Sequence, residues 1–480
     1  MKDLKMENLS KFYIDGVWSQ PNSGATMPVL NPATERQVGV VALGNAADVD
    51  AAVAAASRAF ASYSQTTKAE RLVFLGRLLK VTEARFEDLA QAMSMEMGAP
   101  ISMARDAHAD AAVGHLQGFI EALGQLQERE SLTSGDIQLR EPIGVCGLIT
   151  PWNWPMNQIA LKVIPALATG CTCVLKPSEH TPISAMIYAE IIHEAGFPAG
   201  VFNLVQGDGH TVGAAMSRHC DIQMMSFTGS TRAGTAVTRD AADTVKRVTL
   251  ELGGKSPNLV FADCDLQDRV TASVGECMYN TGQSCDATTR LLVERSCYDV
   301  AVEIAKRAAD ATQVGDPTHE GDHIGPLFDR IQFDRVQAMI AVGIDEGASV
   351  LAGGLGKPEG ITDGWFVKPT VFTDVSNSMR IAREEIFGPV LVIIPFDTEE
   401  EAIEIANDTP YGLAAYLQTG DPVRAERVAA CLRAGAVHIN GGGFNYGSPF
   451  GGYKQSGNGR EGGMMGLEDY LETKTLHGLG

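Results

Sequence analysis

The chain has 480 residues, of which 45% are hydrophobic and 20% are charged. This length exceeds what one hydrophobic core usually organises, so the sequence predicts two or three globular domains. The net charge is −21 and no cluster of Lys or Arg occurs, which argues against a nucleic-acid partner. No apolar run is long enough to cross a bilayer, and residues 1–18 resemble neither a secretory signal nor a transit peptide. We therefore expect no membrane partner and a cytoplasmic location.

The nine cysteines are scattered along the chain and form no CxxC pair. Cys171 and Cys173 flank one Thr within an apolar, strand-like run, which favours packing over zinc binding. Without a secretory signal, this pattern indicates a reducing compartment. We expect free thiols and no metal site.

The first forty residues predict strands and turns, because FYIDGVW places apolar residues on both sides of an Asp-Gly hairpin signal. Helices are then predicted from Asp48 to Tyr63 and from Ala69 to Met97, where apolar residues recur every three or four positions. The sequence Gly98-Ala99-Pro100 marks a break, and a third helical run extends to about Gln127.

From Ile143 onward, short apolar strands alternate with helices. IGVCGLIT predicts the first strand, PWNWP a rigid turn, and CTCVLK, VFNLV, IQMMSF and VKRVTLEL four further strands. The intervening helices are predicted at residues 158–168, 181–195, 210–218 and 230–242. This alternation is typical of βαβ units around a parallel sheet that binds a dinucleotide. One feature departs from the pattern, because the first strand is not followed by GxGxxG.

A second alternating block spans residues 254–455, so the sequence predicts an α/β protein with two parallel-sheet domains. Two strand-like segments lie outside both blocks, SLTSGDIQLREP at residues 131–142 and LEDYLETKTLHG at residues 467–478. Because an unpaired strand edge readily pairs with another chain, we expect these segments to contact a second subunit.

The motif FTGSTRAGTAV, at residues 227–237, leads from a strand through GSTRAG into a helix. The N–H groups and dipole of a helix N-terminus attract an anion. Thr235 stands where a P-loop needs Lys, which excludes a Walker A site. Packing of the helix through its glycine pair is an equally good explanation of GxxxxG.

The motif VLKPSEHTP places Lys176 at a strand end, with Glu179 three residues further on. In an NAD site, a Lys beside a carboxylate can bind the ribose hydroxyls, and the carboxylate repels a 2′-phosphate. Helix capping by Ser178, Glu179 and Thr181 is the alternative.

Two further motifs carry polar groups that catalysis can use. In VTLELGGKSPNLVF, Glu251 ends an apolar strand before a glycine pair, where burial raises a carboxyl pKa toward that of a base. A structural carboxylate that caps Lys255 is the alternative. In PWNWP, Asn153 is framed by two Trp and two Pro, so its amide can donate to an oxyanion. Aromatic packing with an incidental Asn explains the same residues.

Cys285 lies in YNTGQSCDATTR, where no histidine is close in sequence. Most free cysteines only fill space in a protein core, so this segment by itself favours a packing role.

These segments together resemble the NAD(P)-dependent aldehyde dehydrogenase superfamily. The similarity covers almost the whole chain and follows the family's order, through PATERQVG, PWNWP, VLKPSE, FTGSTRAG, LELGGKSPN, NTGQSC, EEIFGPV and PFGGYKQSG. The family binds its dinucleotide without GxGxxG, which accounts for the missing motif. The resemblance implies a Rossmann-like cofactor domain, a catalytic domain, and an oligomerisation arm with a tail, at residues 1–121 with 143–253, 254–455, and 122–142 with 456–480. It also implies a homodimer or homotetramer.

The resemblance implies that Cys285 is the nucleophile, Glu251 the general base and Asn153 the side-chain half of the oxyanion hole. Lys162 and Glu461 align with a proposed proton relay. The implied reaction oxidises a small-molecule aldehyde to its acid with NAD, and less readily with NADP, through a thiohemiacetal and a thioester on Cys285. A thiol that adds to a carbonyl needs no adjacent histidine.

The resemblance also implies the cofactor-binding positions, which are Thr150, Pro151, Trp152, Lys176, Ser178, Glu179, Gly209, Gly229, Ser230, Gly234, Leu252, Glu385 and Phe387. The implied substrate positions are Asn157, Leu161, Ser284, Asp286, Phe444 and Phe450. They mix polar and aromatic side chains and include no Arg, which favours neutral aliphatic or aromatic aldehydes. If the Asp286 carboxylate points into the substrate tunnel, it raises the thiol pKa and disfavours anionic substrates, but outward it matters little.

Two rival functions stay open from the sequence. In acylating relatives, coenzyme A takes the acyl group from the thioester, but these members usually lack the carboxylate that Glu251 supplies. In lens proteins built on this fold the role is structural, which the intact set of Cys285, Glu251 and Asn153 argues against.

Overall fold

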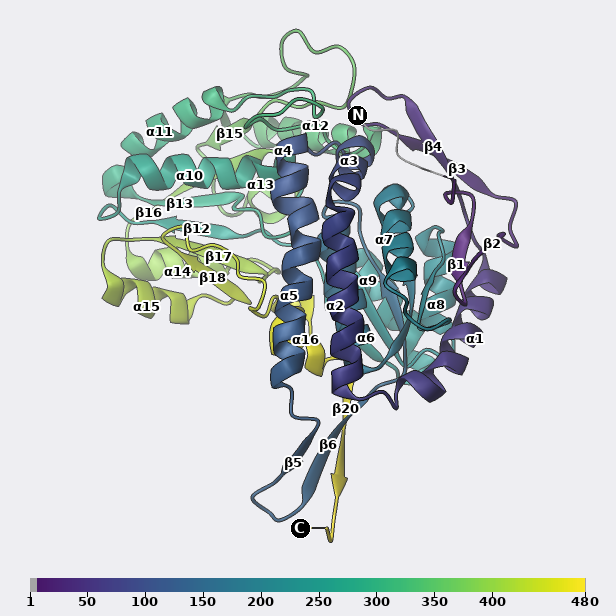
Figure 1. Ribbon diagram of the computed structural model, residues 1–480. Helices are drawn as coiled ribbons and strands as arrows, with labels where there is room; N and C mark the ends of the chain where they lie inside the picture. The colour runs from purple at the N-terminus through teal and green to yellow at the C-terminus, as the bar shows by residue number, and fades with distance from the viewer. Residues whose placement is uncertain (1–6, 480) are drawn as a thin grey trace.

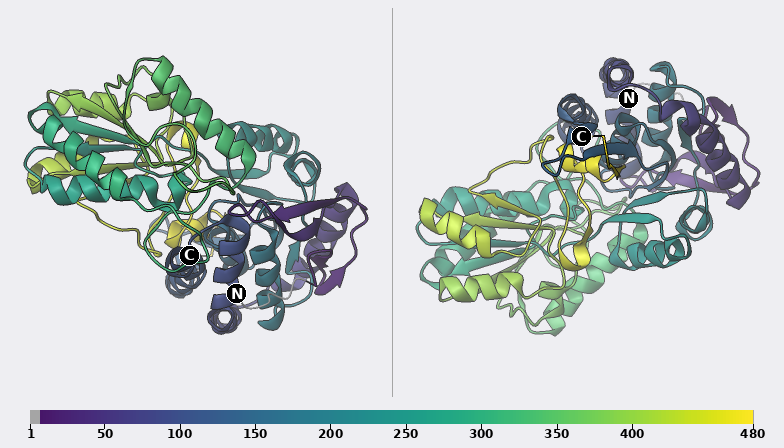
Figure 2. Two further views of the ribbon diagram at one scale, coloured as in Figure 1. Left: turned by 90° about the horizontal axis from the view of Figure 1, so that it is seen from above. Right: turned by 90° about the horizontal axis from the view of Figure 1, so that it is seen from below.

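The computed structural model describes residues 7–479. The chain forms two α/β lobes that lie side by side, with a narrow β arm projecting from the first (Figure 1, Figure 2). The first six residues and the last one, which the sequence assigns to the cofactor domain and the tail, lie outside the described part. No helix among the described residues is long and apolar enough to span a bilayer.

The first lobe contains an eight-stranded sheet whose central strands are parallel. In sheet order its strands are β19 (Gly457–Asn458), β11 (Arg247–Glu251), β10 (Met224–Thr228), β7 (Val145–Ile149), β8 (Thr172–Lys176), β9 (Phe202–Leu204), β1 (Phe12–Ile14) and β2 (Val17–Ser19). From β7 the chain builds outward through β8 and β9, and then returns to add β10 and β11 on the other side. This reversal creates a crevice at the carboxyl ends of β7 and β10, where open α/β sheets bind ligands.

Helices cover both faces of this sheet, because alternate residues of each strand point to opposite faces. From β7, Val145 and Ile149 join one apolar cluster, whereas Cys146 and Leu148 join the other. The first cluster includes α1 (Ala46–Tyr63), α8 (Ala214–Arg218) and α9 (Thr231–Ala241). The second includes α2 (Lys68–Ala84), α3 (Phe86–Met97), α5 (Asp110–Gln125), α6 (Pro155–Thr169) and α7 (Pro182–Glu194).

Three helices predicted as continuous are interrupted. The run predicted from Ala69 to Met97 divides into α2 and α3 at Arg85, whose φ of −103° and ψ of 11° leave the helical region. The Arg85 side chain reaches across to Glu190 and Glu194 on α7, so tertiary contacts outside the run hold the break. The third run comprises α4 (Ile101–Met103), the π-helix η1 (Ala104–Ala109) and α5, and residues 210–218 form η2 (Gly209–Gly213) followed by α8.

The second lobe contains a seven-stranded sheet, parallel except for its edge strand β14. In sheet order its strands are β14 (Ser349–Ala352), β15 (Thr370–Thr373), β16 (Val390–Phe396), β13 (Arg290–Glu294), β12 (Pro257–Val260), β17 (Ala414–Gln418) and β18 (Ala436–Ile439). Its helices are α10 (Leu266–Met278), α11 (Tyr298–Ala311), α12 (Arg330–Asp345), α13 (Arg380–Arg383), α14 (Glu399–Asn407) and α15 (Pro422–Cys431). The two apolar clusters on its faces complete a second core.

Short elements complete the chain. They are the hairpin β3 (Thr26–Leu30) with β4 (Gln37–Ala42), the 3-10 turns η3 (Ala242–Thr244), η4 (Tyr279–Gly282), η5 (Arg295–Cys297) and η6 (Lys454–Ser456), and the helix α16 (Gly463–Glu468). The predicted α/β class with two parallel sheets is confirmed.

The arm is a three-stranded sheet in the order β20 (Leu471–Leu476), β6 (Ile137–Pro142) and β5 (Arg129–Ser131). The sequence suggested that two separate strand edges lie open, and this was wrong, because β6 and β20 pair with each other through six residue pairs. The strands are 330 residues apart in sequence, as the register The open edges of the sheet belong to β5 and β20.

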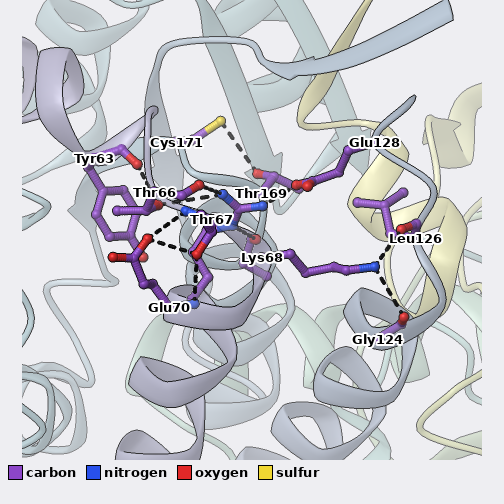
Figure 3. Close-up of polar contacts among 12 residues, drawn as sticks. Tyr63, Thr66, Thr67, Lys68, Glu70, Gly124, Leu126, Glu128, Thr169 and Cys171 are labelled. Atoms are coloured by element: carbon purple, nitrogen blue, oxygen red, sulfur yellow. Dashed lines mark hydrogen bonds and ion pairs between the residues drawn. The ribbon is translucent and has the colours of Figure 1, made fainter.

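The arm is fastened to the first lobe at its base (Figure 3). The buried Arg71 side chain on α2 donates to the Ala168 carbonyl at 2.8 Å and forms an ion pair with Glu128, just before β5. Lys68 Nζ donates to the carbonyl oxygens of Gly124 and Leu126, at 3.3 and 3.0 Å. These contacts join the start of α2 to the end of α5, so the arm leaves the lobe from a fixed base.

Candidate active site

The loop that carries Cys285 has an unusual backbone. Asn280 and Thr281 both have left-handed φ angles, 52° and 56°, and Gly282 follows at 70°. A β-branched residue in this region costs of order 1–3 kcal/mol, so the surroundings must hold it there. Thr281 Oγ1 donates to the Gly325 carbonyl at 3.0 Å, and a Cβ on Gly282 would lie 2.1 Å from the Gly388 carbonyl oxygen. The second lobe therefore fixes the turn immediately before the thiol.

The turn after β7 braces the same loop from the first lobe. Asn153 Nδ2 donates to the Gln283 carbonyl at 3.0 Å, and Asn280 Nδ2 donates to the Asn153 carbonyl at 2.9 Å. Trp154 Nε1 donates to Ser284 Oγ at 2.7 Å. Both interpretations of PWNWP describe part of this geometry, because Trp152 also stacks on Phe328 with ring centroids 4.5 Å apart.

Two cavities meet at Cys285. The larger has a volume of about 610 Å³ and lies between α5, α6, α10 and the segment that follows β18. The smaller, of about 180 Å³, lies between the two lobes and is lined from the first lobe by the ends of β10 and β11. Cys285 and Gln158 line both cavities. The thiol is thus reached from two directions.

All six residues predicted to contact the substrate line the larger cavity together with Cys285; they are Asn157, Leu161, Ser284, Asp286, Phe444 and Phe450. The sequence reasoning missed further lining residues, namely Asp106, Trp154, Glu276, Tyr279, Tyr416, His438 and Tyr446. Helical spacing could have found Glu276 and Tyr279, which follow one face of α10. No Lys or Arg is among the described residues that line this cavity.

Asp286 lies on the wall of the larger cavity, which answers the question of its orientation. Burial raises the pKa of the Cys285 thiol well above its ordinary value, and the nearby Asp286 carboxylate raises it further. Burial also raises the pKa of the Asp286 carboxyl, although its own backbone N–H and His438 oppose this. The thiol is therefore protonated at neutral pH.

Glu251 ends β11 beside the smaller cavity. Among the described residues, neither of its carboxylate oxygens has a hydrogen-bond partner, and Lys255 Nζ has none either, so Glu251 does not cap Lys255. A Cβ on Gly451 would lie 2.7 Å from Glu251 Oε1, so only glycine leaves this carboxylate its space. Burial raises the pKa of Glu251 well above its ordinary value, and the neighbouring Glu461 carboxylate adds to the rise.

Lys162 and Glu461 lie behind Glu251 and form a buried ion pair. Lys162 Nζ also donates to Ser226 Oγ at 3.2 Å. The structure thus brings together the two residues that the family resemblance pairs.

Seven of the predicted cofactor positions line the smaller cavity; they are Pro151, Trp152, Gly229, Ser230, Leu252, Glu385 and Phe387. Ser230 is the N-cap of α9, with its Oγ 3.3 Å from the Ala233 N–H. The hydroxyl of Thr228, at the end of β10, has no hydrogen-bond partner among residues 7–479. A buried, unpaired donor beside a helix N-terminus at the sheet's switch point is suited to a phosphate group.

The opposite wall of the smaller cavity comes from the second lobe. Glu385 Oε1 accepts from the Gly254 N–H at 3.0 Å, which fixes one oxygen of the carboxylate. Phe387 has a left-handed φ of 61° and meets Trp152 edge to face, with ring centroids 5.5 Å apart. Gln332 Nε2 donates to the Phe387 carbonyl at 2.7 Å and supports this conformation.

The remaining six predicted cofactor positions, Thr150, Lys176, Ser178, Glu179, Gly209 and Gly234, lie outside the lining of the smaller cavity. Lys176 Nζ lies 3.0 Å from Glu179 Oε2 and donates to the Gly207 carbonyl at 2.6 Å. Burial by itself raises the pKa of Glu179, but the Lys176 ammonium outweighs it, so the pKa falls below its ordinary value. Gly234 packs against the side chain of Leu252, as the helix-packing interpretation expects.

The capping alternative for VLKPSEHTP does not describe the start of α7. Its first N–H groups, from Ile183 and Ser184, are instead accepted by the buried carboxylate of Glu96 on α3, at 2.6 and 2.9 Å. This cap is 87 residues away in sequence, so no local pattern could have revealed it. Glu179 is consequently left to Lys176 alone.

The fold and this site define a Rossmann-like, two-lobed α/β protein in which a cleft between the lobes meets a second cavity at one cysteine. The family model of the aldehyde dehydrogenase family matches residues 18–476. A 3-succinoylsemialdehyde-pyridine dehydrogenase from a Pseudomonas species is 50% identical over 474 residues, which are 98% of this chain and 99% of that one.

Solved structures agree with this similarity. Aldehyde dehydrogenase C of Pseudomonas syringae, a cysteine-to-alanine mutant in complex with NAD+ and octanal, has a TM-score of 0.98 and 50% identity, covering 100% of this chain and 99% of its own. A Bacillus cereus aldehyde dehydrogenase in complex with NAD+ has a TM-score of 0.95 and 41% identity, over 99% and 98% of the two chains. The chain belongs to the aldehyde dehydrogenase family, and the resemblance inferred from the motifs is confirmed.

Proposed function

We propose that the protein oxidises an aldehyde to its carboxylic acid with NAD+, through a covalent intermediate on Cys285. The observation that carries the proposal is the position of this thiol at the junction of the two cavities. An aldehyde in the larger cavity and a nicotinamide in the smaller one would both reach the same sulfur. The complex of the Pseudomonas syringae relative with NAD+ and octanal supports this pairing of ligands.

The first step is addition of the Cys285 sulfur to the aldehyde carbon, which forms a C–S bond and converts the carbonyl oxygen into an oxyanion. Asn153 Nδ2 already donates one hydrogen to the Gln283 carbonyl. An amide nitrogen has two hydrogens, so the second is free to donate to the oxyanion beside the Cys285 backbone N–H. The Gln283 contact thus orients the donor in advance.

The smaller cavity fits NAD+ through residues of this chain. The N-terminus of α9 with Ser230 and the unpaired hydroxyl of Thr228 would hold the diphosphate. Glu385 and Phe387 would hold the nicotinamide ribose, and Lys176 with Glu179 the adenosine ribose. When bound, NAD+ supplies the acceptor for the aldehyde hydride, which leaves the acyl group as a thioester on Cys285.

Glu251 would then remove a proton from the water that attacks the thioester and releases the acid. Its raised pKa and unpaired oxygens suit a general base, because a base works best when its pKa is near the operating pH. This residue also favours hydrolysis over transfer of the acyl group to coenzyme A, since acylating relatives usually lack it.

The substrate class that the larger cavity fits best is a neutral aliphatic or aromatic aldehyde. Aromatic side chains line it, and three carboxylates, of Asp106, Glu276 and Asp286, oppose an anionic substrate. A volume of about 610 Å³ admits a tail much longer than that of acetaldehyde.

The test compares wild type, Cys285→Ala and the matched control Cys431→Ala, whose thiol is exposed and far from the proposed chemistry. NADH absorbance is followed with a panel of aldehydes, and NAD+ binding is measured by calorimetry. We expect Cys285→Ala to bind NAD+ normally but to retain less than about 1% of the activity, whereas Cys431→Ala matches wild type. Substantial activity in Cys285→Ala would overturn the proposal.

A further inference from the structure

The outer wall of the larger cavity is a surface segment, residues 441–449, which we call the strap. Three glycines, Phe444 and Tyr446 from the strap line the cavity. The strap is mostly exposed, and Phe444 is 46% exposed, so little protein covers it from outside. The stability of this wall therefore depends on what holds the strap from within.

The strap is held against α5 by Tyr446. A Cβ on Gly114 would lie 2.1 Å from two carbons of the Tyr446 ring, and a Cβ on Gly118 would lie 2.8 Å from the Tyr446 carbonyl oxygen. Tyr446 Oη donates to Asp110 Oδ2 at 2.8 Å. Asp110, Gly114 and Gly118 are four residues apart and so share one face of α5. This face is a socket in which any side chain larger than glycine would displace the ring.

The socket is continuous with the substrate-facing side of the cavity. His115 meets the Tyr446 ring edge to face at 4.8 Å between centroids, and the Phe444 ring at 5.8 Å. His115 Nε2 lies 2.7 Å from Asn157 Oδ1 on α6, another residue of the cavity wall. Burial lowers the pKa of His115 to about 4, although the bond to Asn157 opposes this, so the ring is uncharged at neutral pH. Strap and socket together present an uncharged, aromatic wall.

We propose that Asp110, Gly114 and Gly118 are positioning residues which, by seating Tyr446, set the preference of the cavity for aldehydes with long unbranched or aromatic tails. This inference rests on the proposed function and names the substrate feature selected at that site. A long tail packs on the seated strap, and each buried methylene contributes favourable transfer free energy. The tail of a two-carbon aldehyde is too short to use the wall.

The test is a pair of glycine substitutions in the same helix. Gly114→Ala places a methyl group in the socket, whereas at Gly124 of α5 a Cβ would meet nothing within 4 Å. Both changes raise helix propensity equally. With octanal we expect Gly114→Ala to lose about tenfold or more in kcat/KM, mainly through KM, because about two methylene contacts are enough for one decade. With acetaldehyde it should stay within about twofold of Gly124→Ala.

A double-mutant cycle with Tyr446→Ala separates the proposed route from a general loss of structure. If Gly114 acts through Tyr446, then Gly114→Ala adds little to Tyr446→Ala with octanal, and the melting temperature of Gly114→Ala stays near that of Gly124→Ala. Equal octanal kinetics in Gly114→Ala and Gly124→Ala would overturn the inference while the proposed function stands. Parallel losses with both aldehydes would also overturn it. A wild type that oxidises neither aldehyde, nor any other in a broad panel, would instead overturn the proposed function.

Discussion

Lys162 and Glu461, 299 positions apart in sequence, form a fully buried ion pair behind the carboxylate of Glu251. Glu461 comes from the segment after the strap, where its backbone pairs with Phe450 in an isolated bridge. Lys162 comes from α6, the helix that begins directly after PWNWP. The pair therefore joins the proposed oxyanion donor, the base and the substrate wall into one packed unit.

This pair predicts a shift in the pH dependence of catalysis. Glu461 raises the pKa of Glu251, whereas Lys162 lowers it by a smaller amount. In Glu461→Gln the raising charge is lost, so the pKa of Glu251 falls and the acid limb of the kcat profile moves to lower pH. The double variant Lys162→Met/Glu461→Gln should fall between the single variant and wild type.

The control for that experiment is thermal unfolding, because an unpaired buried lysine destabilises a protein by about 3–5 kcal/mol. An acid limb that does not move in a folded Glu461→Gln protein would show that Glu461 does not act on the base.

The raised pKa of the Cys285 thiol predicts slow, pH-dependent alkylation of the apoenzyme. Because only the thiolate reacts, the rate of iodoacetamide labelling of the Cys285 peptide should rise about tenfold per pH unit from pH 6 to 8. Asp286→Asn removes a neighbouring negative charge and should speed labelling at pH 7, whereas the exposed control Asp363→Asn should not. Labelling that is independent of pH would mean that the resting thiol is already ionised.

The ion pair of Lys176 and Glu179 predicts a preference for NAD+ over NADP+. The pKa of Glu179 lies below its ordinary value, so the carboxylate is charged at neutral pH and repels a 2′-phosphate. A cost of roughly 1–3 kcal/mol predicts a preference of about tenfold or more in kcat/KM. Glu179→Gln should reduce that preference, measured with both cofactors at saturating aldehyde. Equal use of both cofactors by wild type, or an unchanged ratio in the variant, would contradict the assignment.

Local patterns in the sequence predicted most elements of the fold, because strands such as β7 and β8 are short apolar runs bounded by turn residues. What local patterns could not predict depends on contacts between distant segments. The break at Arg85 is held by α7, the cap of α7 is Glu96 from α3, and β6 pairs with β20 from the other end of the chain. Each of these requires the fold before it can be inferred.

The candidate site shows the same division. The family motifs placed Cys285, Glu251 and Asn153 correctly beside one another, and all six predicted substrate positions line one cavity. The left-handed backbone at Thr281 and the seating of Tyr446 on Gly114 have no local signal. Gly114 in particular looks like an unfavourable residue within a helix until its partner from the strap is known.

The open edges of β5 and β20 predict self-association through the arm, as a homodimer or homotetramer. The arm projects from the lobe with its edges unpaired among the described residues, and a second chain could extend the sheet (Figure 1). Multi-angle light scattering should give an integral multiple of the 51.1 kDa chain mass. A monodisperse monomer at that mass would contradict the expectation.

The central claim, that an acyl group is carried by Cys285 and released by Glu251, is tested most directly in Glu251→Gln. The variant is mixed with NAD+ and octanal, quenched within one turnover, and digested for mass spectrometry, while NADH is followed by stopped flow. We predict a burst of NADH close to one per active site, a slow steady rate, and an octanoyl group on the peptide that contains Cys285. Uniformly slow NADH formation without a burst, and no acyl mass on that peptide, would contradict the account.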